Sequence, residues 1–190
     1  MNKAVMLSIR PKWVEKIANG EKTIEVRKTK PKLETPFKCY IYCTLPKYPH
    51  EDFIATDYPR PQFYGGGKVI GEFTCDRIYK IDEDSTDFLF KAGGLSVYKQ
   101  AAEEKCGLCV AMTDDELHGY LGHCQGYGWH ISDLRIYDTP RELSEFRRAT
   151  DPCDSCHAEY TWECTDCKKL GGGIKRPPQS WCYVEAMKDD

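Results

Sequence analysis

The stretch ANGEKTIEVRKTKPK, residues 18–32, decides how the rest of the chain is interpreted. A glycine-centred turn leads into a run in which apolar and charged side chains alternate. Ile24 and Val26 are expected on one face of an extended strand, and Glu25 and Arg27 on the other, because successive side chains of a strand point to opposite faces. The pattern predicts either a half-buried edge strand or a strand that lines a polar cleft.

The charged side chains of this run, Lys22, Glu25 and Arg27, suit the recognition of a phosphate-bearing ligand. Arg27 offers a planar fork of donors for a phosphate or a base edge. Glu25 can pair with Arg27 or accept from the amino group of a base. The alternative is a surface strand whose charges pair with neighbouring side chains. If the strand binds a ligand, Arg27→Ala should abolish binding and leave the melting temperature nearly unchanged.

Charge is distributed unevenly along the 190 residues. Nine basic and three acidic residues fall within the first 32 positions, which gives this part a charge of +6. The whole chain has a net charge of −3, so the remainder carries −9. A local positive face on an acidic protein favours a small or specific nucleic-acid ligand over long duplex DNA.

The hydrophobic fraction of 41% is sufficient for one core, and we expect a single domain over residues 1–190. No apolar run approaches the roughly 20 residues that a membrane helix needs, and the apolar run at residues 4–9 is too short for a signal peptide. We therefore expect no membrane association and a cytoplasmic location. Cys39, Cys43 and Cys75 lie in strand-like apolar runs, which predicts buried, unreactive thiols.

Other cysteines of the chain occur in CxxC pairs. We favour metal binding as their role, because disulfides are rare in a reducing compartment. Two CxxC pairs separated by seven residues lie in a cysteine-rich insertion at residues 150–175, before the last strand. Four thiolates form the closed tetrahedral set that structural Zn²⁺ prefers. A redox-active pair, coincidence, or His157 in place of one thiolate are the alternatives. The predicted zinc ligands are Cys153, Cys156, Cys164 and Cys167.

A second set of residues has a spacing that resembles zinc ligands. A helix is expected within this set, because Thr113 and Glu116 form the pattern of a capping box. Whether it is a second metal site is left open by the sequence. The residues are Cys106, Cys109, His118 and His123.

Aromatic side chains provide candidates for the surface on which a nucleobase stacks. They are Trp13, Tyr64, Trp129 and Trp181, and each could instead belong to the core. Trp129 beside His130 is the preferred candidate, because strand alternation sends one inward and the other outward. His130 could act as an acid or base, or be a hydrogen-bonded structural residue.

Short apolar runs separated by Gly- and Pro-rich connections predict an α+β, mainly β fold. Five or six strands with short helices suggest a small β-barrel with insertions. Residues 46–67 are expected to form a long loop. We expect strands at 3–9, 22–30, 37–45, 68–81, 127–137 and 180–186, and helices at 11–18, 95–104, after 113 and at 140–148.

The order of these segments resembles the ASCH domains of the PUA-like superfamily. The core Gly20-x-Lys22-x-x-Glu25-x-Arg27 is similar to the GxKxxExR signature of that family. The blocks GWHISDLRIYDTPRELSEF, residues 128–146, and RPPQSWCYVE, residues 176–185, resemble pieces of bacterial and phage-type members. The resemblance implies a PUA-like β-barrel with a cleft beside the first helix. It does not explain the cysteine-rich segment, which we expect to be a zinc-knuckle-like insertion in this fold.

The resemblance also implies a ligand: RNA, or a modified nucleoside or nucleotide. Lys22, Glu25, Arg27, Trp129 and His130 are the expected ligand-binding residues. Small enzymes related to this family hydrolyse an acyl amide on cytidine with a lysine, a threonine and a glutamate, and other members are linked to ribonuclease activity. Lys22 matches the lysine, and Glu25 stands where the threonine would be, so these two are the candidate catalytic residues. The alternatives to a binding module are a hydrolase of the same fold and a zinc-stabilised protein-interaction adaptor.

Overall fold

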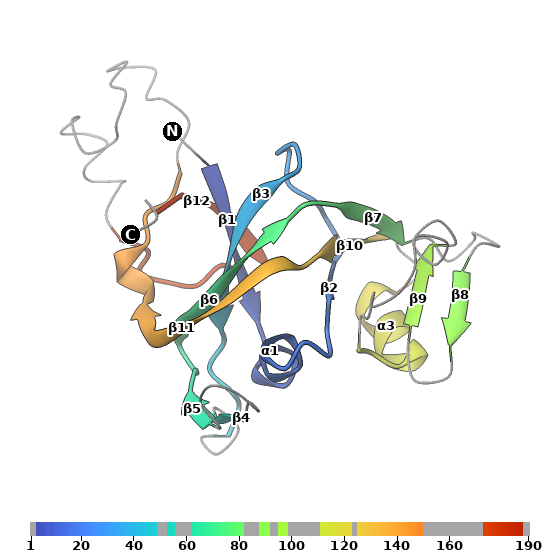
Figure 1. The fold of residues 1–190 in the computed structure, drawn as a ribbon, viewed down its shortest axis with the longest axis horizontal. Helices are drawn as coiled ribbons and strands as arrows, with labels where there is room; N and C mark the ends of the chain where they lie inside the picture. Colours follow the sequence, from blue (N-terminus) through green and yellow to red (C-terminus); the bar gives the residue numbers. More distant parts are fainter. Residues whose placement is uncertain are drawn as a thin grey trace.

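The computed structural model describes most of the chain (Figure 1), and all structural statements below concern the described residues. These are residues 3–48, 53–55, 62–81, 88–91, 95–98, 111–122, 125–149 and 173–187. Within them, no helix is long and apolar enough to cross a membrane.

A five-stranded sheet forms the larger part of the fold. Its strand order is β11-β6-β3-β1-β12, with β1 and β3 parallel and the other neighbours antiparallel. The apolar runs predicted as strands supply its buried centre, where Val5, Leu7 and Ile41 are fully buried. The strands are β1 (Lys3–Ile9), β3 (Phe37–Cys43), β6 (Lys68–Cys75), β11 (Ser132–Glu142) and β12 (Trp181–Glu185).

A three-stranded antiparallel sheet contains the strand with which the sequence analysis began. Its order is β2-β10-β7, so β2 lies at an edge. The strands are β2 (Ile24–Arg27), β10 (Gly126–His130) and β7 (Ile78–Ile81). Two hairpins complete the strands: β4 (Phe53–Ala55) with β5 (Gln62–Tyr64), and β8 (Phe88–Lys91) with β9 (Leu95–Tyr98).

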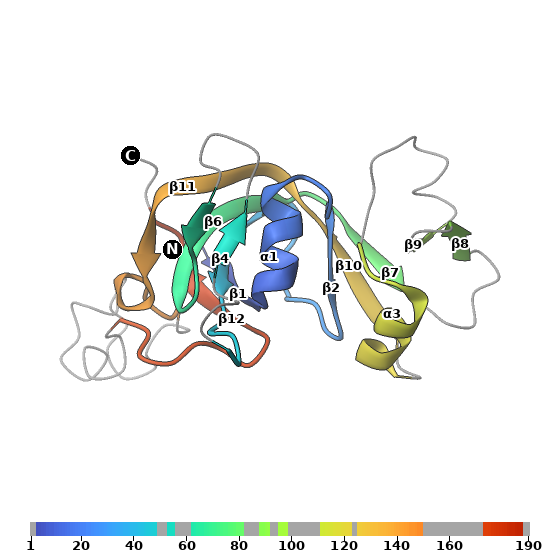
Figure 2. The same cartoon turned by 90° about the horizontal axis from the view of Figure 1, so that it is seen from below.

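Two chain segments lie side by side and run from the larger sheet into the smaller one, as Figures 1 and 2 show. One contains β6 and β7, which are separated at residues 76–77, and the other contains β10 and β11, which are separated at residue 131. At this corner the backbone N–H of His130 donates to the carbonyl of Arg77 over 2.9 Å. Each predicted long strand, 68–81 and 127–137, is therefore two strands that belong to different sheets.

Two short helices cover parts of these sheets. Helix α1 (Pro11–Ala18) begins with proline, whose missing N–H is not needed in the first turn, and buries Val14 and Ile17. Helix α3 (Asp114–Leu121) begins with the predicted capping box. The Thr113 hydroxyl accepts from the N–H of Glu116 over 3.2 Å, and the Glu116 carboxylate accepts from the N–H of Thr113 over 3.0 Å.

The mainly β fold is confirmed, with more strands than the five or six predicted, and the closure of a barrel is not confirmed. The described residues form two main sheets and two hairpins without a closed barrel. The prediction of a helix at 95–104 was wrong for the residues that the structure describes. Apolar and polar side chains alternate along residues 95–98, which form strand β9 and pair with β8. Residues 46–67, predicted as a loop, contain β4 and β5.

The helix expected at 140–148 was wrong because Pro140 was interpreted as a first helical residue. It lies instead in β11, at the edge of the larger sheet, where the pairing with β6 is irregular between Ile136 and Arg141. Proline is tolerated at such an edge because it has no N–H to donate to a partner strand. Only a short 3₁₀ helix, η2 (Leu143–Glu145), follows.

The buried thiols predicted for the strand-like runs are confirmed. Cys39, Cys43 and Cys75 are fully buried and are not part of disulfides. Burial raises the pKa of Cys75 to about 12 and raises the pKa of Cys39 well above its ordinary value. These thiols remain protonated, and therefore poor nucleophiles, at neutral pH.

Candidate functional site

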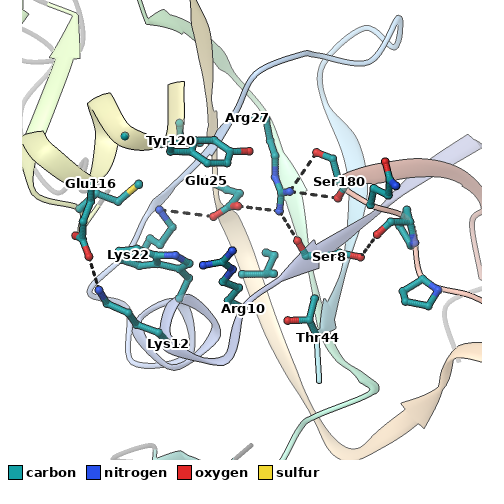
Figure 3. Close-up of a pocket in the computed structure, with 18 residues that line it drawn as sticks. Ser8, Arg10, Lys12, Lys22, Glu25, Arg27, Thr44, Glu116, Tyr120 and Ser180 are labelled. Atoms are coloured by element: carbon teal, nitrogen blue, oxygen red, sulfur yellow. Dashed lines mark hydrogen bonds and ion pairs between the residues drawn. The ribbon is translucent and has the colours of Figure 1, made fainter. Parts of the chain in front are cut away.

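A pocket of about 590 Å³ lies where α1, β2, α3 and the segment before β12 meet (Figure 3). Its lining is rich in charged and hydroxyl side chains, with two aromatic rings. The lining residues are Ser8, Ile9, Arg10, Lys12, Trp13, Lys22, Glu25, Val26, Arg27, Thr44, Met112, Glu116, Gly119, Tyr120, Pro177, Pro178, Gln179 and Ser180.

Strand β2 and the turn before it place three buried charged side chains in this pocket: Glu25 and Arg27 from the strand and Lys22 from the turn. We call these three residues the charge cluster. Their exposed fractions are 2%, 6% and 5%. Glu25 lies between the two cations, with Oε2 at 3.6 Å from Lys22 Nζ and Oε1 at 2.9 Å from an Arg27 terminal nitrogen. Because an isolated buried charge is very costly, each ion here depends on the others.

Alternation along β2 follows the sequence prediction, but both faces are covered. Ile24 and Val26 pack in a cluster that includes Leu117 and Leu121 of α3. The opposite face carries Glu25 and Arg27 into the pocket, which Lys22 reaches from the turn before the strand. The strand is therefore an edge strand and a pocket wall at once, and the half-buried alternative is excluded because all four of its residues are buried.

Arg27 is held by the protein itself, which changes its expected role. One terminal nitrogen donates to the Ser8 carbonyl over 2.9 Å and also contacts Glu25, while the other donates to the carbonyl and the hydroxyl of Ser180 over 3.2 and 3.3 Å. The guanidinium fork is thus engaged, rather than open for a phosphate. The expectation that Arg27→Ala would spare stability is not supported by this geometry.

One donor of Arg27 remains: its buried Nε–H has no hydrogen-bond partner among the described residues. Tyr120 lies beside Arg27 in the pocket (Figure 3). Burial raises the pKa of the Tyr120 hydroxyl, which therefore stays protonated at neutral pH. Tyr120 thus adds a neutral aromatic surface and a hydroxyl group next to the charge cluster.

The ring of Trp13 forms a second aromatic wall and has three ammonium groups around it. Lys12, Lys16 and Lys22 place Nζ at 4.5, 5.9 and 5.3 Å from the ring centroid. Lys12 also pairs with Glu116 of α3. The two helices that flank the pocket are therefore joined by an ion pair.

Hydroxyl groups come to the pocket from three separate parts of the chain. Ser8 ends β1, Thr44 follows β3 and Ser180 precedes β12. The Ser8 hydroxyl donates to the carbonyl of Pro178 over 2.6 Å, which fixes the segment 177–180 against β1. The pocket thus contains hydroxyl groups that come from elements other than β2.

The structure brings Lys22, Glu25 and Arg27 together, but it places Trp129 and His130 elsewhere. Trp129 is fully buried in the core, with its ring centroid 5.8 Å from that of Phe37. A ring in this position presents no surface for stacking a ligand. The Nδ1 atom of His130 lies 2.6 Å from a carboxylate oxygen of Asp76, at the corner between the sheets.

Several pocket residues were not identified from the sequence. Arg10 and Tyr120 gave no local signal, because each reaches the pocket only through the packing of a helix. The segment 177–180 belongs to a block that resembles ASCH members, and this was the signal that could have identified it. Thr44 falls just beyond the predicted apolar strand and carries no motif.

The predicted zinc ligands lie outside the described residues, so the zinc site stays a prediction. The same holds for Cys106, Cys109 and His123 of the second set. His118 is described and lies exposed on α3. Among the described residues, no group of three or more His, Cys, Asp or Glu side chains is arranged to hold a metal ion.

Comparison with solved structures identifies the fold. The crystal structure of ASCH from Zymomonas mobilis matches with a TM-score of 0.54 and 16% identity, covering 97% of this chain and 90% of that chain. A tyrosine-to-phenylalanine mutant of the same protein matches with a TM-score of 0.53 and 15% identity, covering 96% of this chain and 90% of its own. No family model and no curated protein matches the sequence. The chain therefore has the ASCH fold, as the order of the segments that resemble ASCH domains predicted.

Proposed function

We propose that the pocket binds a nucleotide or modified nucleoside presented by RNA. The observation that carries this proposal is Glu25, a carboxylate held between two buried cations in an open pocket with aromatic walls. A buried ion pair contributes little to stability compared with apolar side chains of the same size. A cluster of three such charges on a pocket wall is therefore better explained by ligand recognition than by stability.

The pocket offers matching groups for each part of a nucleotide. A carboxylate has about four acceptor positions, so Glu25 can accept from the amino group of a base while it stays paired with Lys22 and Arg27. Trp13 and Tyr120 provide aromatic surfaces for the base. Arg10 is exposed at the lining of the pocket and can donate to a phosphate.

Size and fold are consistent with such a ligand. A volume of about 590 Å³ lies within the roughly 300–1,000 Å³ that small-molecule sites occupy. The ASCH fold and the GxKxxExR motif on β2 add support, because the family resemblance implies RNA or a modified nucleotide as the ligand.

Calorimetric titration with cytidine, cytidine 5′-monophosphate and N4-acetylcytidine tests the proposal. Wild-type protein should bind at least one of them with one-to-one stoichiometry. Tyr120→Leu should weaken binding by about tenfold or more, because stacking on an aromatic ring contributes roughly 1–3 kcal/mol per base. Arg10→Gln should weaken binding of the phosphate-bearing ligand only.

The matched control is Tyr48→Leu, which removes an exposed tyrosine outside the pocket and should leave every affinity unchanged. Absence of saturable binding for all three ligands and for single-stranded RNA would refute the proposed function. An equal effect of Tyr48→Leu and Tyr120→Leu would show that binding occurs elsewhere.

Hydrolysis of a nucleoside amide or of RNA is the second candidate function. It is favoured by the position of Lys22 and Glu25 in the same pocket as Ser8 and Thr44, because a hydroxyl nucleophile needs a nearby basic group. Incubation of the protein with N4-acetylcytidine and with RNA, followed by mass spectrometry, separates the two functions. Turnover that is lost in Lys22→Gln would establish the hydrolase, and recovery of the unchanged ligand would favour the binding protein.

A further inference from the structure

The segment that follows β2, residues 28–32 (KTKPK), carries three exposed lysines and no acidic residue. We call Lys28, Lys30 and Lys32 the basic row. It begins immediately after Arg27, which lines the pocket. Much of the positive charge in the first 32 residues is therefore placed on the surface next to the candidate ligand site.

Two lysines of the basic row are positioned by tyrosine rings. Lys28 Nζ lies 5.6 Å from the ring centroid of Tyr120 on α3, and Lys30 Nζ lies 5.6 Å from that of Tyr127 on β10. Such cation–π contacts contribute about 0.5–1 kcal/mol at exposed sites. They reduce the number of positions that each long side chain samples, so less entropy is lost when an anion binds.

Two hydrogen bonds also hold this segment against β12, one to the side chain of Thr29 and one from the backbone of Lys32. The Trp181 indole N–H donates to the Thr29 hydroxyl over 3.0 Å, and the backbone N–H of Lys32 donates to the Tyr183 hydroxyl over 2.7 Å. The segment therefore runs from α3, past β10, to β12. Because Tyr120 both lines the pocket and contacts Lys28, the row starts at the pocket.

We propose that the basic row binds the phosphates of a single-stranded RNA whose nucleotide occupies the pocket. This inference rests on the proposed function and extends it from one nucleotide to a strand. A base in the pocket must be unpaired, which favours a single strand over a duplex. Five residues span at most about 17 Å, so the row is long enough for a few consecutive phosphates.

Lysine is the suitable residue for this role. An ammonium group attracts a phosphate as a point charge without demanding a particular geometry. The row would therefore strengthen binding of any sequence, whereas the pocket would select the nucleotide. The overall net charge of −3 opposes unspecific binding elsewhere on the protein.

The test is fluorescence anisotropy with a fluorescein-labelled nine-nucleotide RNA at several salt concentrations. For single strands the logarithm of affinity falls with the logarithm of salt concentration with a slope of about −0.7 per neutralised phosphate. The triple variant Lys28→Gln, Lys30→Gln, Lys32→Gln should therefore lose about 2 from this slope. Between 50 and 200 mM salt, affinity of the wild-type protein should fall about 20-fold more than that of the variant.

The matched control is Lys47→Gln, because Lys47 is an exposed lysine at 5.3 Å from a tyrosine ring that lies outside the row. Lys30→Gln should lower the salt slope by about 0.7. Lys47→Gln should leave the salt slope unchanged. The single variants keep the test usable if the triple variant does not fold. An unchanged slope in Lys30→Gln and in the folded triple variant would overturn the proposal.

Two further measurements separate this inference from the proposed function. The affinity of the double variant Lys30→Gln, Lys32→Gln for cytidine should equal that of the wild type, because these two lysines lie outside the lining of the pocket. If the variants of the basic row bind cytidine and their salt slope for RNA is unchanged, the proposed function of the pocket is retained and the proposal for the basic row is overturned. A duplex of the same length that binds as tightly as the single strand would also overturn it.

Discussion

Replacing Arg27 by alanine should unfold the protein more easily, as well as weaken ligand binding. The side chain is 5% exposed and its guanidinium contacts Glu25, the Ser8 carbonyl and Ser180. Its removal leaves Glu25 with Lys22, at 3.6 Å, as its remaining partner within the charge cluster. It also removes a donor from the partly buried carbonyl groups of Ser8 and Ser180.

The size of the effect follows from these contacts. Removing one partner of a buried ion pair costs about 3–5 kcal/mol, because the other charge loses its compensation. For a chain of 150–250 residues, about 1 kcal/mol corresponds to roughly 2–4 °C in melting temperature. We therefore expect Arg27→Ala to lower the free energy of unfolding by about 3–5 kcal/mol and Tm by about 6–20 °C.

Urea denaturation followed by tryptophan fluorescence measures this difference. A lower midpoint with an unchanged m-value would indicate lost stability without a change in the unfolded state. The control is Arg10→Ala, since Arg10 is an exposed arginine at the same pocket and should change stability by less than about 0.5 kcal/mol. If Arg27→Ala costs no more than Arg10→Ala, the reasoning from burial and partners is refuted.

Two other predictions concern charge and metal. The hydrogen bond from Lys12 lowers the pKa of Glu116, so this carboxylate stabilises the fold above its ordinary pKa and loses that effect as the pH falls through the lowered value. Glu116→Gln should therefore reduce the difference in Tm between pH 6 and pH 3, and an unchanged difference would contradict this. Protein purified without chelator should contain about one Zn²⁺ per chain, bound by the insertion at residues 150–175. Mass spectrometry that finds no zinc would refute the metal prediction.

Much of the fold could be predicted because local patterns were strong. Pro11 at the first turn of α1, the capping box before α3 and the apolar run of β3 each determine their element through short-range chemistry. The charge cluster could be predicted as a site because its residues are close in sequence, with Glu25 and Arg27 on one face of a strand and Lys22 in the turn that precedes it.

What could not be predicted depends on packing between distant segments. Two successive charged residues, Asp76 and Arg77, interrupt the run 68–81, but a short polar interruption does not by itself show that the chain changes sheets there. Tyr120 reaches the pocket only because α3 covers β2. The fork of Arg27 was interpreted as open because its acceptors, at Ser8 and Ser180, lie far away in the sequence.

These same acceptors determine when during folding the pocket can form. Arg27 bonds to residues 19 and 153 positions away, near the two ends of the described chain. Contacts of such high sequence separation form late, because the intervening chain must first be ordered. A chain in which β12 has not yet docked has β2 but lacks the wall at residues 177–180. Ligand binding would therefore distinguish completed molecules from partly folded ones, and a bound ligand would keep the last strand in place.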